Sequence, residues 1–378
     1  HDNEAAPSWL GTAYRRLLTP FLDSSRLRMF LLAGILALLA LSAGLALLRD
    51  VPLKMLPFDN KNEFQVLCDL PEGSPAEAAD RAVRALEDVL RRAPEVTAFA
   101  TYTGLASPMD FNGLVRHYYL RSSGNLAEIR VNLVDKDHRT AQSHAIVLRL
   151  RPELEAAARA HGARLKLVET PPGPPVLATV TAEVYGPPAL AYPDLVAAGR
   201  ELAGRMAAAP LVTDVDTSAE AEREALTFTL DKEKAALHGV TAADVTSTLA
   251  LAVSGDTPAN VHRPGERQPL PVRLILPRAE RSTAAGLGQL PLRTAAGGMV
   301  HLAELGSFRL APVDQPIYHK NLERVVFTYA DTAGRAPGEA ILDLQKDVRK
   351  NPLPPGVRVE WAGEGEWEIT LTVFRDLG

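Results

Sequence analysis

Residues 64–102 read FQVLCDLPEGSPAEAADRAVRALEDVLRRAPEVTAFATY, and they predict a strand, a helix and a second strand. The apolar run Phe64–Leu70 favours a strand, and Val96–Tyr102 favours another. Between them, apolar residues at helical spacing form one face of a helix: Ala79, Ala82, Val83, Leu86 and Leu90. The stretch is therefore predicted to be a β-α-β unit.

The start of this helix carries two sequence signals. Ser74 and Glu77 fit the capping-box pattern, in which each side chain bonds the backbone of the other residue. Pro75 is expected at the first helical position, where its missing N–H costs nothing. The helix is predicted to continue to Arg92.

Three more elements complete this group. A strand is predicted at Ala127–Val134, a long helix at about Gln142–His161 ended by Gly162, and a strand at Arg164–Glu169. Pro152 is expected to kink the long helix. The order β-α-β-β-α-β is the ferredoxin-like pattern. The proline-rich run at residues 170–175 is expected to be a stiff linker.

A second β-α-β unit follows this linker. A strand at Ala178–Tyr185, a helix carrying Leu195 to Met206 and a strand at Val212–Thr217 are predicted. Its helix exit reads P-x-V-T-x-x-x-T, as does the exit at Pro94–Thr101. We interpret this match as a weak internal repeat.

The second unit is interrupted before it is complete. Residues 225–310 are expected to be an insertion that contains a strand at Leu226–Leu230 and a helix at Ala242–Val253. The strand Arg324–Tyr329, the helix Gly338–Arg349 and the strand Val357–Trp361 then finish the second unit.

The run Met29–Leu48, MFLLAGILALLALSAGLALL, carries no charge. A helix of about 20 residues spans about 30 Å, the thickness of the hydrocarbon core of a bilayer. A cleavable signal peptide fits poorly because the run is long and 28 residues precede it. A buried core helix is the remaining alternative. Arginines before the run weakly favour a cytoplasmic N-terminus.

Composition excludes several classes of protein. The formal net charge of −5 leaves no basic footprint for nucleic acid. No phosphate-binding loop, zinc-protease or nucleophile-elbow motif is present, so we expect neither an enzyme nor a cofactor. The single cysteine, Cys68, lies in a predicted strand and is expected to be a buried apolar residue.

Several stretches resemble the RND (resistance-nodulation-division) efflux permeases. They are residues 51–61 after the membrane run, FQVLCDLPEGS at 64–74, TFTLDKEKAALHGV at 227–240 and GVRVEWAGEGEWEITLTVFRDLG at 356–378. The resemblance is strongest to the C-terminal half of such a permease, so both ends look cut from a longer polypeptide. It implies an α+β fold in which one transmembrane helix precedes ferredoxin-like β-α-β porter subdomains with an inserted docking subdomain.

The resemblance also implies how the chain is divided. The ranges are a cytoplasmic junction segment (1–28), the transmembrane helix (29–48), a first porter subdomain (63–172), a second porter subdomain (173–224 and 311–362), a docking subdomain (225–310) and a lead-in to a next membrane helix (363–378).

The function implied is multidrug or xenobiotic efflux driven by protons. The resemblance implies a homotrimer among the lipids of the bacterial inner membrane, with most of the chain periplasmic. It also implies a periplasmic adaptor, an outer-membrane channel and a small-molecule substrate. The family's proton-relay residues lie on membrane helices outside this segment. A different hypothesis is a single-pass, membrane-anchored periplasmic binding or adaptor module.

The loop at residues 104–119, GLASPMDFNGLVRHYY, resembles the family's flexible loop beside the substrate pocket. Its flexible, aromatic and polar-tipped side chains suit a pocket for varied apolar ligands. The candidate substrate-binding residues are Met109, Asp110, Phe111, Asn112, Arg116, His117, Tyr118 and Tyr119. The alternative is a surface loop whose aromatic residues cover the edge of a sheet.

The segment Ser254–Pro269 is rich in Gly, Pro and Asp and predicts a protruding hairpin or arm. It either reaches a neighbouring subunit or remains exposed to solvent. The candidate docking residues are Asp256, Asn260, His262 and Arg263.

No metal site is expected from the sequence. The methionines lack ligand spacing, and Met206 falls on a predicted apolar helix face. His117, His138 and His144 are expected to be surface or capping residues.

Overall fold

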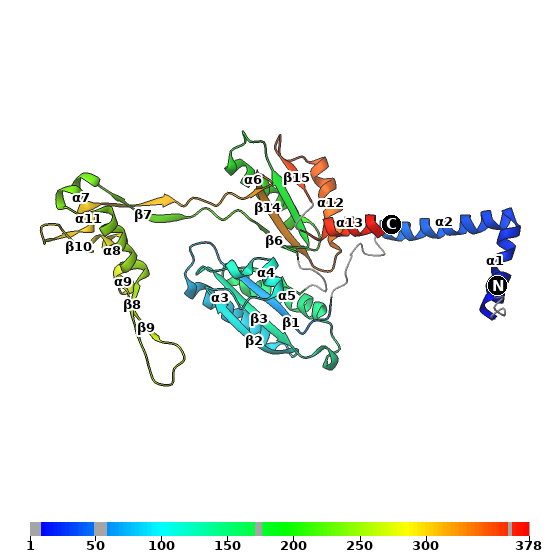
Figure 1. Ribbon diagram of the computed structural model, residues 1–378, viewed down its shortest axis with the longest axis horizontal. Coiled ribbons are helices and arrows are strands. Elements are labelled where there is room, and N and C mark those ends of the chain that lie inside the picture. The colour runs from blue at the N-terminus through cyan, green and yellow to red at the C-terminus, as the bar shows by residue number, and fades with distance from the viewer. Residues whose placement is uncertain (1–8, 49–58, 171–175, 362–364, 378) are drawn as a thin grey trace, which may run out of the picture. The chain divides into compact units, whose positions relative to one another are not determined.

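The computed structural model describes residues 9–48, 59–170, 176–361 and 365–377 (Figure 1). It divides into a larger unit, His1–Glu220 with Ile317–Gly378, and a smaller unit, Ala221–Pro316. The predicted loop after the membrane run and the proline-rich linker fall largely outside the described residues. Each unit is described by itself below.

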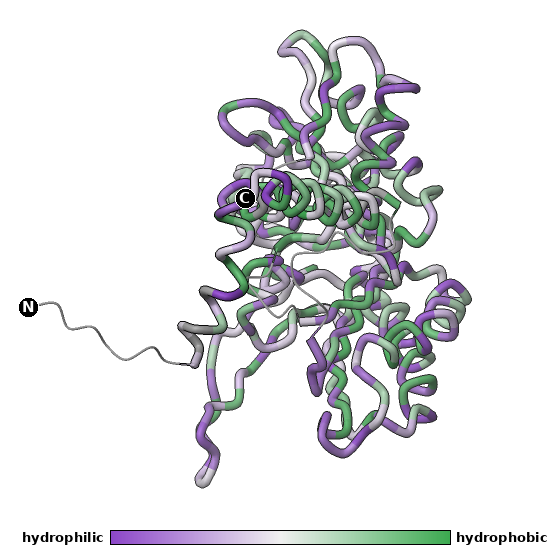
Figure 2. Tube along the Cα trace, turned by 90° about the vertical axis from the view of Figure 1, so that its right-hand side faces the viewer, coloured by the Kyte–Doolittle hydropathy of each residue, from purple (hydrophilic) through white to green (hydrophobic). Residues whose placement is uncertain are grey.

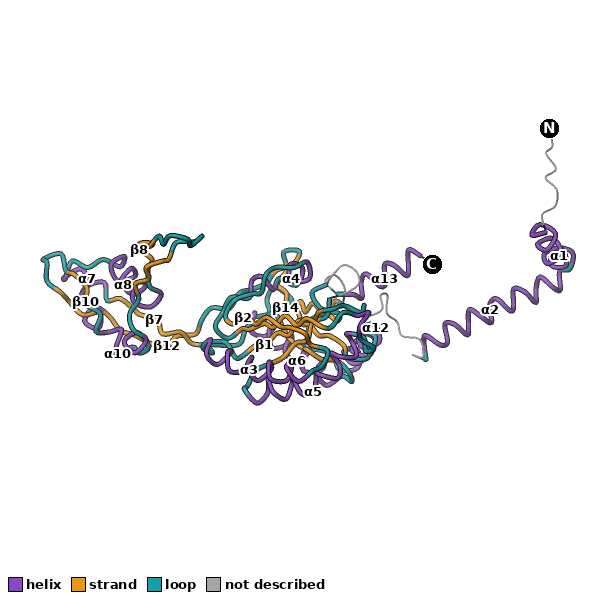
Figure 3. The backbone as a smooth tube through the Cα atoms, turned by 90° about the horizontal axis from the view of Figure 1, so that it is seen from below, coloured by secondary structure: helices purple, strands orange, loops and turns teal. Residues whose placement is uncertain are grey.

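The larger unit contains two sheets, and the first follows the predicted order of elements. These are β1 (Glu63–Asp69), α3 (Ala76–Arg92), β2 (Val96–Thr103), β3 (Leu126–Leu133), α5 (Ser143–Ala160) and β4 (Arg164–Val168). The strands lie in the order β2-β3-β1-β4, with antiparallel neighbours. Figure 3 shows α3 and α5 on one side of this sheet.

The predicted capping box of α3 is wrong. Pro75 is itself the N-cap residue, with extended backbone angles and no capping hydrogen bond from a side chain. Ser74 lies one residue earlier and its N–H donates to Pro71 O in a turn, so its side chain is not at the capping position. The predicted end of α5 is confirmed, because Gly162 follows it with a left-handed φ of 70°.

The second sheet repeats the topology of the first. Its elements are β5 (Val180–Tyr185), α6 (Tyr192–Ala208), β6 (Val212–Thr217), β13 (His319–Lys320), β14 (Glu323–Thr332), α12 (Pro337–Lys350) and β15 (Arg358–Glu360). The strands β6, β14, β5 and β15 are neighbours in that order, with β13 on the other end of β14. Val96 and Val212 of the shared motif begin the equivalent strands β2 and β6.

Each sheet has an apolar core of its own. The first cluster includes Val66, Leu86 and Ile129, and the second includes Val184, Leu202 and Met206. Gly199 lets α6 approach β14, because a Cβ there would lie 2.6 Å from Val326 Cγ1. In Figure 2 hydrophobic and hydrophilic residues alternate along the helices, as expected for helices with one buried face.

The smaller unit begins and ends with a two-stranded ribbon, β7 (Glu224–Leu230) and β12 (Gly306–Pro312). Between them lie α7 (Lys232–His238), α8 (Ala242–Ser254), β8 (Asp256–Val261), β9 (Leu270–Leu274), α9 (Arg278–Arg281), α10 (Ala284–Gly288), β10 (Pro291–Arg293), β11 (Met299–His301) and α11 (Leu302–Leu305). Thr241 and Asp244 form a complete capping box at α8. A third apolar cluster, including Val245, Leu302 and Leu305, supports this unit.

Helices also lie near the two ends of the described chain, and the last of them packs Trp367 against the second core. The apolar run forms α2 (Ser25–Leu47), and its segment Ser25–Leu45 is long and apolar enough to cross a membrane. Ser24 begins this helix, since its side chain accepts a bond from Leu27 N. A helix that the sequence pattern did not indicate, α1 (Trp9–Asp23), precedes it. The last helix, α13 (Glu366–Leu377), falls within the predicted lead-in.

Cys68 is fully buried in the first core, as predicted. Burial is the main cause that raises the pKa of the thiol, to about 12, and the charge of Asp69 adds to it.

We expect no maleimide labelling of Cys68 in the native chain at neutral pH, because the reagent cannot reach the sulfur and the thiol stays protonated. Labelling should become complete in denaturant. Ser122→Cys, at an exposed position, should label at once in the folded protein. Rapid native labelling of Cys68 would contradict the packing of β1.

Candidate functional site

The predicted substrate loop is partly helical and is fixed to the first sheet. It contains α4 (Phe111–Val115) and the 3-10 turn η1 (Tyr118–Leu120). Asp110 caps α4, because its Oδ1 accepts a bond of 2.6 Å from Gly113 N. Its second oxygen pairs with Arg130 of β3, which also donates to Pro108 O at 3.0 Å. Figure 3 shows α4 on the side of the first sheet opposite α3 and α5.

The loop exposes a group of apolar side chains. Met109 is 63% exposed and Phe111 is 67% exposed. The exposed large apolar residues of this segment are Leu105, Met109, Phe111, Leu114, Tyr119 and Leu120. The ring of His117 lies edge-on to that of Tyr119. These side chains are available to contact an apolar ligand.

Other predicted residues of the loop are buried. Asn112 is buried, and its Oδ1 has no hydrogen-bond partner within the described chain. Arg116 is also buried, with Nη1 at 3.6 Å from Asp331 Oδ2 on β14 and 3.4 Å from the Tyr118 hydroxyl. Burial opposes its charge, but Tyr118 and Asp331 outweigh that effect and raise the pKa of Arg116, so it stays charged.

A buried cluster of charges that the sequence analysis missed lies on the first sheet. Arg121 pairs with Asp69 at 2.5 Å and with Glu128 at 3.1 Å. Lys166 lies 3.4 Å from Asp69, and Gln65 donates to Glu128 at 2.9 Å. Gln65 and Asp69 are polar residues two positions either side of Leu67 in an otherwise apolar run, so all three lie on one face of β1, and these polar residues were the available signal.

The cluster sets the charge of Asp69. Burial disfavours the carboxylate, but Arg121 and Lys166 outweigh it and hold the pKa of Asp69 below its ordinary value. These residues pair with one another. They stabilise the face of the first sheet that lies opposite its helices.

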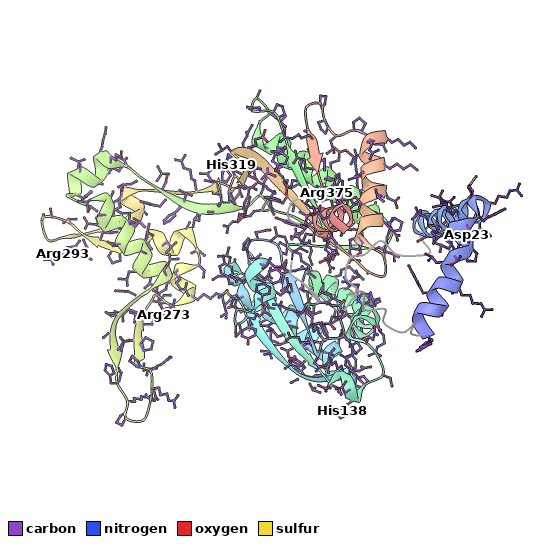
Figure 4. The ribbon with its side chains drawn as sticks, turned by 45° about the vertical axis from the view of Figure 1, so that its right-hand side comes forward. Asp23, His138, Arg273, Arg293, His319 and Arg375 are labelled. Atoms are coloured by element: carbon purple, nitrogen blue, oxygen red, sulfur yellow. The ribbon has the colours of Figure 1, made fainter. Side chains whose placement is uncertain are left out.

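The predicted arm is an exposed hairpin formed by β8 and β9. Asp256 and Asn260 lie on β8, whereas His262 and Arg263 follow in the turn. Arg273, labelled on this hairpin in Figure 4, donates to Ser254 O at 3.0 Å and ties the hairpin to the end of α8.

Two pockets in the described part of the chain lie away from the candidate residues. One of about 300 Å³ is lined by Thr248, Leu251, Ala252, Leu274, Ile275, Leu276 and Leu290 of the smaller unit. Another, of about 400 Å³, includes Leu211, Arg335 and Glu339 at one end of the second sheet. Neither contains a residue that the sequence predicted for binding.

Metal-ligating side chains are dispersed. In the described parts of the chain, no group of three or more His, Cys, Asp or Glu residues is placed to hold a metal ion. His144 lies 2.7 Å from Glu169, and His138 lies in the 3-10 turn η2 (Lys136–His138) (Figure 4). Met206 is fully buried in the second core, as predicted.

The family of the chain follows from a comparison with family models. The model of the AcrB/AcrD/AcrF family matches residues 3–372, nearly the whole chain. This chain belongs to that family. The RND resemblance seen in the sequence is therefore confirmed.

Curated relatives in the family are metal-resistance proteins. The nickel and cobalt resistance protein CnrA of Cupriavidus metallidurans is 27% identical over 195 residues, which are 50% of this chain and 18% of CnrA. The cation efflux system protein CusA of Escherichia coli K12 is 29% identical over 142 residues, 36% of this chain and 13% of CusA.

A solved structure shares the fold. The X-ray structure of a heavy metal efflux pump superposes with a TM-score of 0.71 at 19% sequence identity. The match covers 99% of this chain and 37% of the pump. The chain thus spans little more than a third of that pump, and an α+β fold of this kind is shared along nearly its whole length.

Replacing Asp69 by Asn should destabilise the first sheet in a pH-dependent way. The change removes the carboxylate that the partly buried Arg121 and Lys166 share, which costs about 2 kcal/mol at neutral pH because Glu128 and Asp216 still pair with these cations. Because the folded pKa of Asp69 is depressed, its stabilisation is present above the unfolded pKa and is lost as pH falls through the folded pKa.

Urea titrations followed by circular dichroism measure this effect. The difference between unmodified and Asp69→Asn protein should be large at neutral pH and should decrease as the pH falls below about 4, the pKa of an unfolded aspartate. Asp80→Asn on α3, whose partner Arg84 is exposed, is the matched control and should change little at either pH. An equal loss at both pH values would contradict the role given to the Asp69 charge.

Proposed function

We propose that this chain is the C-terminal-half segment of a proton-driven RND exporter that captures cargo on the periplasmic side of the inner membrane. The observation that carries the proposal is the family match over residues 3–372. Residues 63–172 and residues 173–224 with 311–362 act as ferredoxin-like porter subdomains. Residues 225–310 act as the docking subdomain.

The arrangement of the chain supports these assignments. Two sheets share one strand order, β2-β3-β1-β4 in the first and β6-β14-β5-β15 in the second. The smaller unit is inserted between β6 and β14 and folds around its own core. An apolar helix, α2, precedes both sheets and is long enough to hold them at a membrane.

The partners follow from the same family membership. We infer a homotrimer that engages a periplasmic adaptor and an outer-membrane channel through the docking subdomain. The exposed hairpin with Asp256, Asn260, His262 and Arg263 is the part of that subdomain available for a subunit contact. Protons are relayed by membrane helices other than α2, whose apolar run Met29–Leu48 contains no ionisable residue.

The cargo we propose is a small amphiphilic organic molecule. The exposed Met109 and Phe111 supply apolar contact area on the loop, and Tyr119 adds an aromatic ring with a polar tip. Asp110 and Arg130 fix the backbone that carries them. This arrangement suits ligands that differ in shape but share an apolar body.

A second candidate cargo is a metal cation. The names of two relatives favour it, since CnrA is a nickel and cobalt resistance protein and CusA a cation efflux system protein. On this candidate the thioether of the exposed Met109 would contact a soft ion.

Replacing Phe111 by Ala distinguishes the two cargoes. The complete gene is expressed in an efflux-deficient host, and growth is scored against organic compounds and against salts of nickel, cobalt and copper. If the cargo is organic, loss of the ring should lower resistance to apolar compounds by about tenfold, as expected for a lost apolar contact. Resistance to metal salts should not change.

Matched controls make this result specific. Leu342→Ala truncates a partly exposed apolar residue on α12 and should leave the resistance profile as it was. Resistance to metal salts alone, lowered by Met109→Ala and not by Phe111→Ala, would favour the second cargo. If the protein confers no resistance to any compound, and a protonophore changes nothing, the anchored binding module is favoured instead.

A further inference from the structure

A pocket of the larger unit lies outside the candidate loop and combines charged with apolar side chains. It occupies about 400 Å³ at the end of the second sheet, where β6 begins, β14 ends and α12 begins. We call it the α12 pocket, and its lining includes Pro210, Leu211, Arg335, Ala336, Glu339 and Asp343. A volume of this size accommodates a small organic molecule together with water.

One wall of the α12 pocket is a turn held in a fixed shape. Leu211 has a left-handed φ of 57°, which is uncommon for a residue with a side chain. Its carbonyl accepts a bond of 3.0 Å from Ala333 N, and the carbonyl of Pro210 accepts one of 3.2 Å from Arg335 Nη1. The Leu211 side chain remains 55% exposed. The turn thus places a fixed apolar surface beside the charged groups of the pocket.

Arg335 is the cation of the pocket, and its donors are used within the chain. Its side chain is 8% exposed and donates to the carbonyls of Pro210 and Glu339, the latter at 3.1 Å. Its Nη2 also pairs with the carboxylate of Asp343. An anion in the pocket would have to displace these contacts. Two carboxylates beside one guanidinium leave the lining with an excess of one formal negative charge, which favours a cationic ligand.

Glu339 is the group that points to a ligand. The residue is 9% exposed, and its carboxylate accepts no hydrogen bond from the described residues. Its ion-pair partner is Arg335, whose Nε lies 3.9 Å from Glu339 Oε2, beyond hydrogen-bond distance. A carboxylate offers about four acceptor sites, and leaving them unused in a buried position costs free energy. A donor that enters the α12 pocket reaches these sites.

We propose that the α12 pocket is a binding site for a small primary ammonium ion that carries an apolar body. The N–H groups of the ammonium donate to the unused acceptor sites of Glu339 in charge-assisted bonds. The alkyl portion lies against Leu211 and Ala336. The proposal rests on this geometry alone and holds whichever cargo the candidate loop contacts.

A divalent metal ion fits the α12 pocket less well than an ammonium ion. Calcium and magnesium take about six or more oxygen ligands. The pocket offers the carboxylates of Glu339 and Asp343, and the second of these is already paired with Arg335. Among the described residues no third His, Cys, Asp or Glu joins them in a group that could hold a metal ion.

Ligand-observed NMR of the full chain in phosphatidylcholine nanodiscs tests the proposal, with n-butylammonium chloride as the probe. Saturation transfer should show binding with a Kd of about 1 mM, within the limit for a ligand of this size. Neutral 1-butanol and anionic butyrate share the alkyl chain and should bind at least about tenfold more weakly. Empty nanodiscs correct for partition into the lipid. Equal binding of 1-butanol, or no saturable binding of butylammonium, would overturn the proposal.

Glu339→Gln keeps the size of the side chain and removes its charge. This variant should bind butylammonium about tenfold more weakly, as expected for the loss of a charge-assisted hydrogen bond. Arg335 keeps Asp343 as its partner, so the melting temperature should change little. Asp88→Asn removes an exposed carboxylate on α3 and is the matched control for charge, so it should bind as the unmodified protein does. Undiminished binding by Glu339→Gln would refute the site.

Leu211→Gly provides a second measurement that does not depend on the charge. Glycine adopts the left-handed backbone of this position without strain, so the turn should persist. The change removes the apolar surface and should weaken binding of butylammonium by about threefold. Binding of methylammonium, which lacks the alkyl chain, should not change. An unchanged preference for butylammonium over methylammonium would overturn the apolar contact assigned to Leu211.

Discussion

The alternation of side chains along β1 and β3 is the constraint on which the larger unit depends. Val66 and Cys68 face the helices, whereas Gln65 and Asp69 face the other way. The apolar residues pack α3 and α5 against the sheet, whereas Asp69 pairs with Arg121 and Lys166. A slip of one residue in register would bury charges among the helices. The same alternation therefore fixes the core and supplies the polar face that carries Asp69 and Arg121.

The second sheet also has an apolar face toward its helices and a polar face on the other side, formed by different residues. Val184 and Val326 pack beneath α6 and α12, and the opposite side carries Glu183, held by Lys320 at 2.5 Å. Tyr185 donates to Glu183 at 2.6 Å, and burial followed by this bond raises the pKa of the tyrosine. The helices thus pack on the two sheets in the same way, whereas the polar residues on the opposite faces differ.

The sequence predicts the elements well and the contacts between them poorly. Apolar spacing gives the strands and helices of both sheets because one buried face imposes a period that single residues carry. The capping box at Ser74 is wrong because the helix begins one residue later, with Pro75 as its N-cap residue. Arg151 and Asp214 form an ion pair although they are far apart in the chain, and no periodicity reports such a pair.

In both sheets, the connection between the second and third strands carries an additional segment. After β2 it carries the candidate loop with α4 and η1, and after β6 it carries the whole smaller unit. A duplicated fold thus exposes one junction that accepts a short turn or an entire folded module without disturbing strand order. The two sheets differ most in the length of that connection. New specificity in such a protein is therefore most readily acquired by exchanging what is inserted there, with the sheets left intact as a scaffold.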